Sequence, residues 1–296
     1  MKKTLLISVC CLVLIMLAAC GSDDASGDGG KSGNLLDELK EKGTVTVGFA
    51  NEEPYAYQTD DGELKGAAVD IATAVFKELG VDNVKGQLAD FKQLIPGLNA
   101  GKFDVVTAGM AITPDRCENA DFGEPEMMYG EGLIVQKGNP LDLHSYKDLA
   151  EKNATVSIMS SATENEFVKK EGVSEEQIQS APDIPATFSA VESGRADATT
   201  GTEMTVKMAL ESSGNDKLEF VEDFEQPEDI EGVPSYGAAA FHKDNDKLRE
   251  AYNEKLAELK ESGKIAELLE ANGFNGETNS VPDGITAESV CSGENY

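Results

Sequence analysis

The stretch from Phe103 to Phe122 contains the residues whose types and spacing best fit the capture of a small charged ligand. Residues 104–107 predict a short strand, and the chain then turns at Gly109, where the missing side chain lets the backbone approach a ligand. Arg116 follows, and a planar fork of donors at a strand end suits a carboxylate. The competing interpretation of Arg116 is a surface salt bridge, which residue types alone do not exclude.

Other polar and aromatic residues stand at the ends of predicted strands. Glu52 and Tyr55 follow the strand 44–49, and Phe91 opens a predicted helix. The hydroxyl-bearing segment 160–163, with Ser161 and Thr163, could present hydroxyls and helix N-terminal amides to an anion. Each has a structural alternative: Glu52 as a solvated loop carboxylate, the two aromatic rings as core residues, and the hydroxyl segment as a simple helix cap.

The composition excludes several classes of partner. Asp and Glu number 55 against 25 Lys and Arg, which gives a formal net charge of −30. Such a balance argues against nucleic acid and against binding to anionic lipid through basic patches. It is consistent with simple solubility and with an exported protein in salty surroundings, where charge repulsion is screened.

The N-terminus has the pattern of an export signal. Residues 1–20 combine two lysines, an apolar run too short for a comfortable span, and the ending LAAC. This ending resembles the lipobox of bacterial lipoproteins, which implies that Cys20 becomes the lipidated first residue of the mature protein. Residues 21–33 are rich in Gly, Ser and Asp and predict a flexible tether.

The remaining cysteines predict a disulfide. Of five cysteines, two leave with the signal and Cys20 carries lipid, so Cys117 and Cys291 remain. In an oxidising location we expect these two to pair, with two free buried thiols as the alternative. Two cysteines and two histidines in unrelated contexts do not favour a metal site, and no cofactor is expected.

Strands alternate with helices along the rest of the chain. This alternation predicts an α/β fold with largely parallel sheets that carry helices on both faces. The strand signal occurs twice, and two crossings between the units are expected near 134–139 and 236–241. The predicted helices are 35–42, 66–79, 91–99, 164–172, 185–193, 205–212, 244–262 and 265–271, and the predicted strands are 44–49, 84–88, 104–107, 132–136, 155–158, 177–180, 196–199 and 236–241.

Four motifs together resemble one family. They are NEEPYAY after the first strand, LIPGLNAGKFD, AGMAITPDR and SGRADA. In this combination and order they are similar to the solute-binding proteins of ABC importers that recognise polar amino acids, over about residues 43–274. The likeness is greatest to the subgroup that binds ectoine and hydroxyectoine. The resemblance implies two lobes that close on a ligand about two crossing segments: 34–136 with 241–296 as lobe 1, and 137–240 as lobe 2.

The resemblance also implies roles for particular residues. Arg116 would hold the ligand carboxylate, and Glu52 would accept hydrogen bonds from the cationic ring of ectoine. Tyr55 and Phe91 would sandwich that delocalised cation.

Two positions depart from related patterns. Ala111 stands where the ectoine subgroup tends to have an aromatic residue, so one wall of the cage is missing. Thr202 stands where many amino-acid binders have an Asp for the ligand ammonium, which argues against an ordinary α-amino acid.

We therefore predict a monomeric, lipid-anchored receptor on the outer face of the cytoplasmic membrane. It would capture a small zwitterionic solute and deliver it to an ABC permease. The alternatives are a receptor for a polar amino acid, a dehydratase-like enzyme on the same fold, and a ligand-sensing lipoprotein without a transporter. The enzyme is disfavoured because no nucleophile–base pair or histidine accompanies the motifs.

Overall fold

The computed structural model of the protein describes residues 34–228 and 230–295. The predicted signal peptide 1–20, the lipidation of Cys20 and the tether 21–33 lie outside these residues. No helix in the described part is long and apolar enough to cross a membrane. The elements before the second sheet are α1 (Leu35–Lys42), β1 (Thr44–Phe49), β2 (Tyr57–Gln58), β3 (Leu64–Lys65), α2 (Ala67–Glu78), β4 (Asn83–Leu88), the 3-10 turn η1 (Phe91–Gln93), α3 (Leu94–Asn99), β5 (Val105–Ala111), α4 (Pro114–Cys117), β6 (Asp121–Phe122) and β7 (Met127–Tyr129).

The second half of the chain builds another sheet and then returns to the first. Its elements are β8 (Glu131–Gln136), α5 (Tyr146–Glu151), β9 (Val156–Met159), α6 (Glu164–Lys170), η2 (Glu175–Gln177), β10 (Ile178–Ala181), α7 (Ile184–Glu192), β11 (Ala198–Thr202), α8 (Glu203–Ser213), β12 (Leu218–Phe220), β13 (Ser235–Phe241), α9 (Asp246–Glu261), α10 (Lys264–Ala271) and α11 (Ala287–Cys291).

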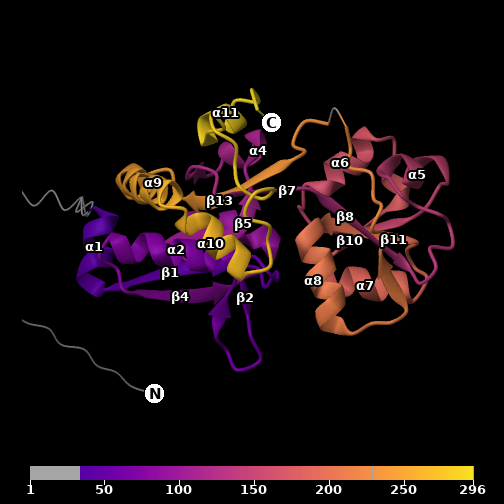
Figure 1. The fold of residues 1–296 in the computed structure, drawn as a ribbon, viewed down its shortest axis with the longest axis horizontal. Coiled ribbons are helices and arrows are strands. Elements are labelled where there is room, and N and C mark those ends of the chain that lie inside the picture. Colours follow the sequence, from indigo (N-terminus) through magenta and orange to yellow (C-terminus); the bar gives the residue numbers. More distant parts are fainter. Residues whose placement is uncertain (1–33, 229, 296) are drawn as a thin grey trace, which may run out of the picture. The chain divides into compact units, whose positions relative to one another are not determined.

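Two mixed sheets organise the described residues (Figure 1). The first has the order β4-β1-β5-β13-β6, with β7 also paired to β13, and the second has the order β10-β9-β11-β8-β12. Strands that are linked by helices pair in parallel, as β1 does with β4 and β5. Strands β8 and β13, which follow the crossings, pair only antiparallel. The α/β fold class predicted from the sequence is confirmed.

Helices cover both faces of each sheet. Along β5, Val105 and Ala111 join the core beneath α2, α9 and α10, whereas Val106 and Met110 join the core beneath α3 and α11. This alternation is the two-residue period of a strand buried on both faces. In the second sheet, α5 and α6 pack on one face and α7 and α8 on the other. The rigid sheets can therefore fix side chains at their strand ends.

The chain changes sheet a few residues before the predicted positions. β8 begins at Glu131 and already pairs with β11 in the second sheet, so the first crossing is at Gly130 and not at 134–139. The second lies between Phe220 and Ser235, because the whole of β13 pairs in the first sheet. The crossings were placed too late in the sequence because an apolar run such as 132–136 does not indicate which of the two sheets it joins. That the two lobes move as separate bodies stays a prediction.

The turn predicted at Gly109 is also wrong. Gly109 lies within β5, which continues to Ala111. Three residues of β5, 107–109, oppose the single residue Ala239 of β13, because Ala238 pairs with Met110 and Ala240 with Val106. This bulge contains Gly109 at φ +60°, a conformation that glycine adopts at little cost.

Candidate functional site

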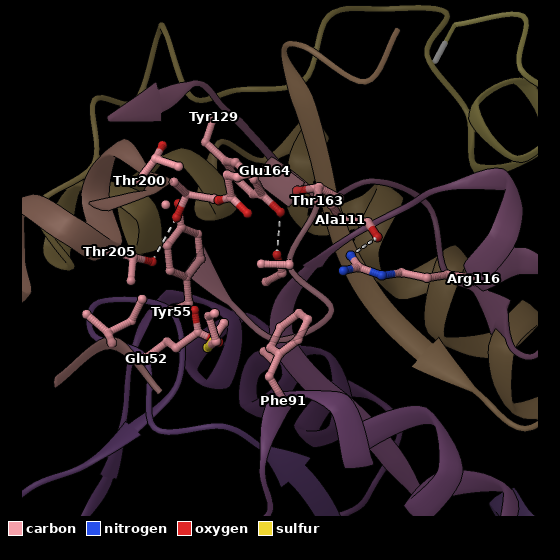
Figure 2. Close-up of a pocket in the computed structure, with 17 residues that line it drawn as sticks. Glu52, Tyr55, Phe91, Ala111, Arg116, Tyr129, Thr163, Glu164, Thr200 and Thr205 are labelled. Atoms are coloured by element: carbon pink, nitrogen blue, oxygen red, sulfur yellow. Dashed lines mark hydrogen bonds between the residues drawn. The ribbon is translucent and has the colours of Figure 1, made fainter. Parts of the chain in front are cut away.

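The candidate site is a cavity lined by residues from both sheets and the segments that follow their strands (Figure 2). It encloses about 470 Å³ not filled by protein, part of it open to solvent. Carboxyl ends of parallel strands are the usual place for ligands in open α/β sheets. The lining residues are Glu52, Tyr55, Phe91, Ala108, Gly109, Ala111, Arg116, Tyr129, Met159, Ala162, Thr163, Glu164, Ile184, Thr200, Gly201, Thr202 and Thr205.

Eight of the nine predicted ligand residues line this cavity. Ser161 is the exception, because it lines a neighbouring groove together with Thr163 and Arg116. It contributes its carbonyl oxygen, which accepts a hydrogen bond from Arg116. Its φ of +68° turns the backbone at this point. Ser161 is therefore a support for the arginine rather than part of the cavity wall.

Arg116 reaches the cavity from the short helix α4. Thr113 caps α4 by accepting a hydrogen bond from the backbone N–H of Arg116, 3.2 Å from its Oγ1. The guanidinium donates to the carbonyl of Ala111 at 2.8 Å and to that of Ser161 at 3.0 Å. Its central carbon lies 5.2 Å from the centre of the Phe91 ring, within cation–π range. One face of Phe91 is thus next to the protein's own cation.

Tyr55 is a core residue that also touches the cavity. It is 2% exposed, and its ring packs edge to face against Tyr129 and Phe274. Its hydroxyl has no hydrogen-bond partner of normal geometry in residues 34–228 and 230–295. Burial raises the pKa of Tyr55 well above its usual value, and the neighbouring Thr202 offsets part of this. The core interpretation of Tyr55 is confirmed, and its ligand role stays a prediction that its place in the cavity wall permits.

Gly109 makes room for Tyr55. A Cβ on Gly109 would meet Cδ1 of Tyr55 at 2.3 Å, so only glycine permits this approach. The hydroxyl of Tyr129, whose ring contacts that of Tyr55, donates to the Gly109 carbonyl at 2.6 Å and so holds the bulge in place. A close approach to Gly109 was expected from a ligand. In the structure, the group next to Gly109 is the ring of Tyr55, which lines the cavity.

Glu52 is held in a tight turn after β1. Its backbone N–H donates to the carbonyl of Ala56, and its carbonyl accepts from Tyr55, both at 2.9 Å. The residue is partly exposed, but its Oε1 is buried and has no hydrogen-bond partner in the described part of the chain. Burial raises the pKa of Glu52 to about 8, the charge of Glu164 adds to this, and Arg116 opposes it. A solvated loop carboxylate does not fit these surroundings.

The second sheet contributes hydroxyls and a further acid. Thr202 donates to the hydroxyl of Thr205 at 2.8 Å, and Thr163 precedes α6 without a side-chain capping bond. Glu164, the first residue of α6, is 3% exposed and lines the cavity. Burial raises the pKa of Glu164 as well. Sequence reasoning missed Glu164, because a glutamate in the first turn of a helix is an ordinary surface pattern.

Glu164 is not the only buried acid here, because Glu131, the first residue of β8, is also buried and interacts with it. Sequence reasoning also missed the lining residues Ala108, Tyr129, Met159, Ala162, Ile184, Thr200, Gly201 and Thr205. Thr200 directly follows the predicted strand 196–199, and Thr205 is the first residue of the predicted helix 205–212, so position at an element end was the available signal. Tyr129 has no such signal. It lies at the end of β7, and its hydroxyl bonds the carbonyl of Gly109 within the bulge of β5.

Comparison with known proteins gives a consistent result. The profile of bacterial extracellular solute-binding proteins, family 3, matches residues 45–273. A probable amino-acid ABC transporter periplasmic-binding protein of Sinorhizobium fredii, y4tE, is 38% identical over 262 residues, 87% of this chain and 86% of that protein. The L-cystine-binding protein TcyA of Bacillus subtilis is 29% identical and covers 90% of this chain and 96% of its own.

A solved structure is similar over the same region. The crystal structure of EhuB in complex with hydroxyectoine has a TM-score of 0.78 and 32% sequence identity, and covers 87% of this chain and 98% of its own.

Proposed function

The chain belongs to family 3 of the bacterial extracellular solute-binding proteins, and we propose that it captures a compact zwitterionic solute, ectoine or hydroxyectoine. At the coarser level it is a solute-binding receptor of an amino-acid-type ABC importer, which works with a membrane permease. The relatives are binding proteins, so catalysis has no support from them.

One observation carries the choice of ligand. The cavity has a guanidinium, Arg116, at one wall and a buried carboxyl oxygen without a partner, Glu52 Oε1, at another. A ligand with a carboxylate and a flat cation that bears N–H groups would satisfy both, and the aromatic rings of Tyr55 and Phe91 suit such a cation. Ectoine has both groups, and EhuB with hydroxyectoine is a structural neighbour.

A polar amino acid is the second candidate. Ala111 leaves the wall open where a third aromatic ring would stand, and y4tE is named as a probable amino-acid binder. Thr202, however, offers an α-ammonium only a neutral hydroxyl oxygen in place of a carboxylate, so the positive charge has no opposite charge at this position. Glycine betaine should bind worse than either, because it has no N–H for Glu52.

Calorimetric titration of the mature protein separates these candidates. The panel is ectoine, hydroxyectoine, glycine betaine, L-glutamine, L-arginine and L-cystine. We expect ectoine or hydroxyectoine to bind at least tenfold more tightly than the others. Tight binding of an amino acid without binding of ectoine would refute the ectoine assignment and leave the importer receptor in place.

We further propose that Cys20 anchors the receptor to the outer face of the cytoplasmic membrane and that the mature protein is a monomer. The lipobox-like ending LAAC supports the anchor. Cys20→Ala should abolish the lipid-modified mass in the membrane fraction, and the soluble variant should elute as a monomer on gel filtration. An unmodified Cys20 in wild-type membranes would contradict the anchor.

A further inference from the structure

Three carboxyl groups gather at the cavity, more than one zwitterionic ligand needs. Glu52 and Glu164 line it, and Glu131 lies behind them. Glu131 is 1% exposed and Glu164 is 3% exposed. A second, independent feature points to a ligand at this place: the buried Tyr55 hydroxyl, on a residue that lines the same cavity, has no hydrogen-bond partner of normal geometry in the described residues, and only the Thr202 side chain interacts with it (Figure 2).

Glu131 supports Glu164 from the protein interior. The two carboxyl groups form a hydrogen bond, which requires one proton between them. Tyr146 holds Glu131 from the other side, donating to its Oε2 at 3.3 Å, and also bonds the hydroxyl of Thr200 at 2.6 Å. Burial raises the pKa of Glu131 well above its usual value, and the charge of Glu164 raises it further. Glu164 is the member of this pair that lines the cavity, so its carboxyl group is the one that can accept hydrogen bonds there.

The surrounding charges define what can satisfy this acceptor. The charged and titratable groups near the pair are Arg116, Glu52, Tyr55, Tyr129 and Tyr146. Arg116 is the cation among them, and a ligand carboxylate would neutralise it. Glu52 and Glu164 then remain, and Glu164 is close enough to raise the pKa of Glu52. Leaving Glu52 Oε1 buried and unpaired would be costly, so it needs a ligand donor, and Glu164, which lines the same cavity, can accept a second one.

From this arrangement, which rests on the function proposed above, we propose that Glu164 is a specificity-determining residue: supported by Glu131, it forms a second acidic subsite opposite Glu52, and the pair selects a solute whose flat cation carries N–H donors on two sides. An amidinium or guanidinium has donors on two sides. A quaternary ammonium has none.

Three isosteric variants test this subsite by calorimetry with the panel above. Glu164→Gln should bind ectoine and hydroxyectoine at least tenfold more weakly, because a neutral amide replaces a charged acceptor. Glu166→Gln, on the same helix but exposed and paired with Lys169 at 3.3 Å, is the matched control and should bind as the wild type does. Glu131→Gln should stay within about threefold of wild type, because the amide donates to Glu164 as the protonated acid does.

The outcomes separate this inference from the proposed function. If the wild type and Glu164→Gln bind ectoine equally well, the subsite is overturned and the proposal of an ectoine receptor stands. Wild type that binds L-arginine or L-glutamine in place of ectoine overturns the ectoine assignment, and the same variants are then titrated with that amino acid. A tenfold loss in Glu164→Gln alone supports the subsite, and no loss overturns it. A wild type that binds no member of the panel overturns both the subsite and the ectoine assignment. An unchanged melting temperature of Glu164→Gln excludes misfolding as the cause of weaker binding.

Discussion

Arg116 is positioned by the protein's own backbone. Its guanidinium donates to two carbonyl oxygens, one before α4 and one before α6, and lies over Phe91. A planar fork can make these contacts and still present donors to a ligand carboxylate, whereas an ammonium group has no such geometry.

We therefore expect Arg116→Lys to weaken ligand binding by at least about 30-fold, or ~2 kcal/mol. Calorimetry with ectoine measures the change. Arg195→Lys is the matched control, because Arg195 is exposed and bonds the Ser193 side chain away from the cavity. Equal affinity in Arg116→Lys and wild type would remove Arg116 from the site.

The raised pKa of Glu52, about 8, makes ligand affinity depend on pH. A cation bound beside Glu52 favours the ionised carboxylate, so below pH 8 binding must release a proton. Affinity should therefore rise from pH 6 to pH 8, by up to about tenfold per pH unit, and level off above pH 8. Calorimetry at pH 6, 7, 8 and 9 measures this. In Glu52→Gln the slope should become smaller, and an affinity that falls as pH rises would contradict the assignment.

At the scale of elements, β5 is the strand on which the site depends. It places Gly109 and Ala111 at the cavity, and its bulge at 107–109 brings Tyr55 and Tyr129 against the strand. The backbone conformation and the close ring contact both require glycine at position 109.

Gly109→Ala should therefore displace Tyr55, lower stability by about 2–3 kcal/mol and weaken binding. Gly101→Ala is a well-matched control, because Gly101 has a similar φ of +66° but nothing within 4 Å of its added Cβ. Urea denaturation and calorimetry compare the two variants. Equal losses of stability in both would show that backbone strain alone, and not the Tyr55 contact, makes glycine necessary.

Most elements could be predicted from the sequence because their periodicity is local. The helix 35–42 and the strand 44–49 have the observed bounds, and Gly43 ends the helix in a left-handed conformation. The short strands β6, β7 and β12 were missed, because two or three residues carry no period and form through long-range pairing with β13 or β8.

The site was predictable where motif residues follow strand ends, as Glu52 and Arg116 do. It was not predictable where burial decides the chemistry. Glu131 and Glu164 read as ordinary charged residues at element starts, and only tertiary packing buries them and brings their carboxyl groups together. Ser161 was predicted to offer its hydroxyl to the ligand, but the left-handed backbone there presents its carbonyl to Arg116.

At the scale of the whole molecule, Cys117 and Cys291 form a disulfide between α4 and α11, with Cα atoms 5.8 Å apart and 174 residues of separation. The bond attaches the C-terminal segment next to Arg116. Closing so long a loop stabilises a protein by about 5 kcal/mol in the chain-entropy model.

Cys117→Ser with Cys291→Ser should accordingly lower the free energy of unfolding by several kcal/mol, about 5 by that model. Urea denaturation of the double variant and of the oxidised wild type measures this difference. Alkylation followed by mass spectrometry of the unreduced mature wild type should find neither thiol free. Two alkylated cysteines there would show that the bond does not form in the mature protein.

The position of β13 determines which of the two sheets can be completed first while the protein is being synthesised. β13 lies between β5 and β6 in the first sheet, yet it is the last strand of the described chain. A nascent polypeptide that has emerged only to Phe220 contains every strand of the second sheet, while the first sheet lacks the strand that joins β5 to β6. The half of the molecule that is translated first is therefore completed last. Until residues 235–241 leave the ribosome, the sheet that positions Arg116 at the cavity is incomplete.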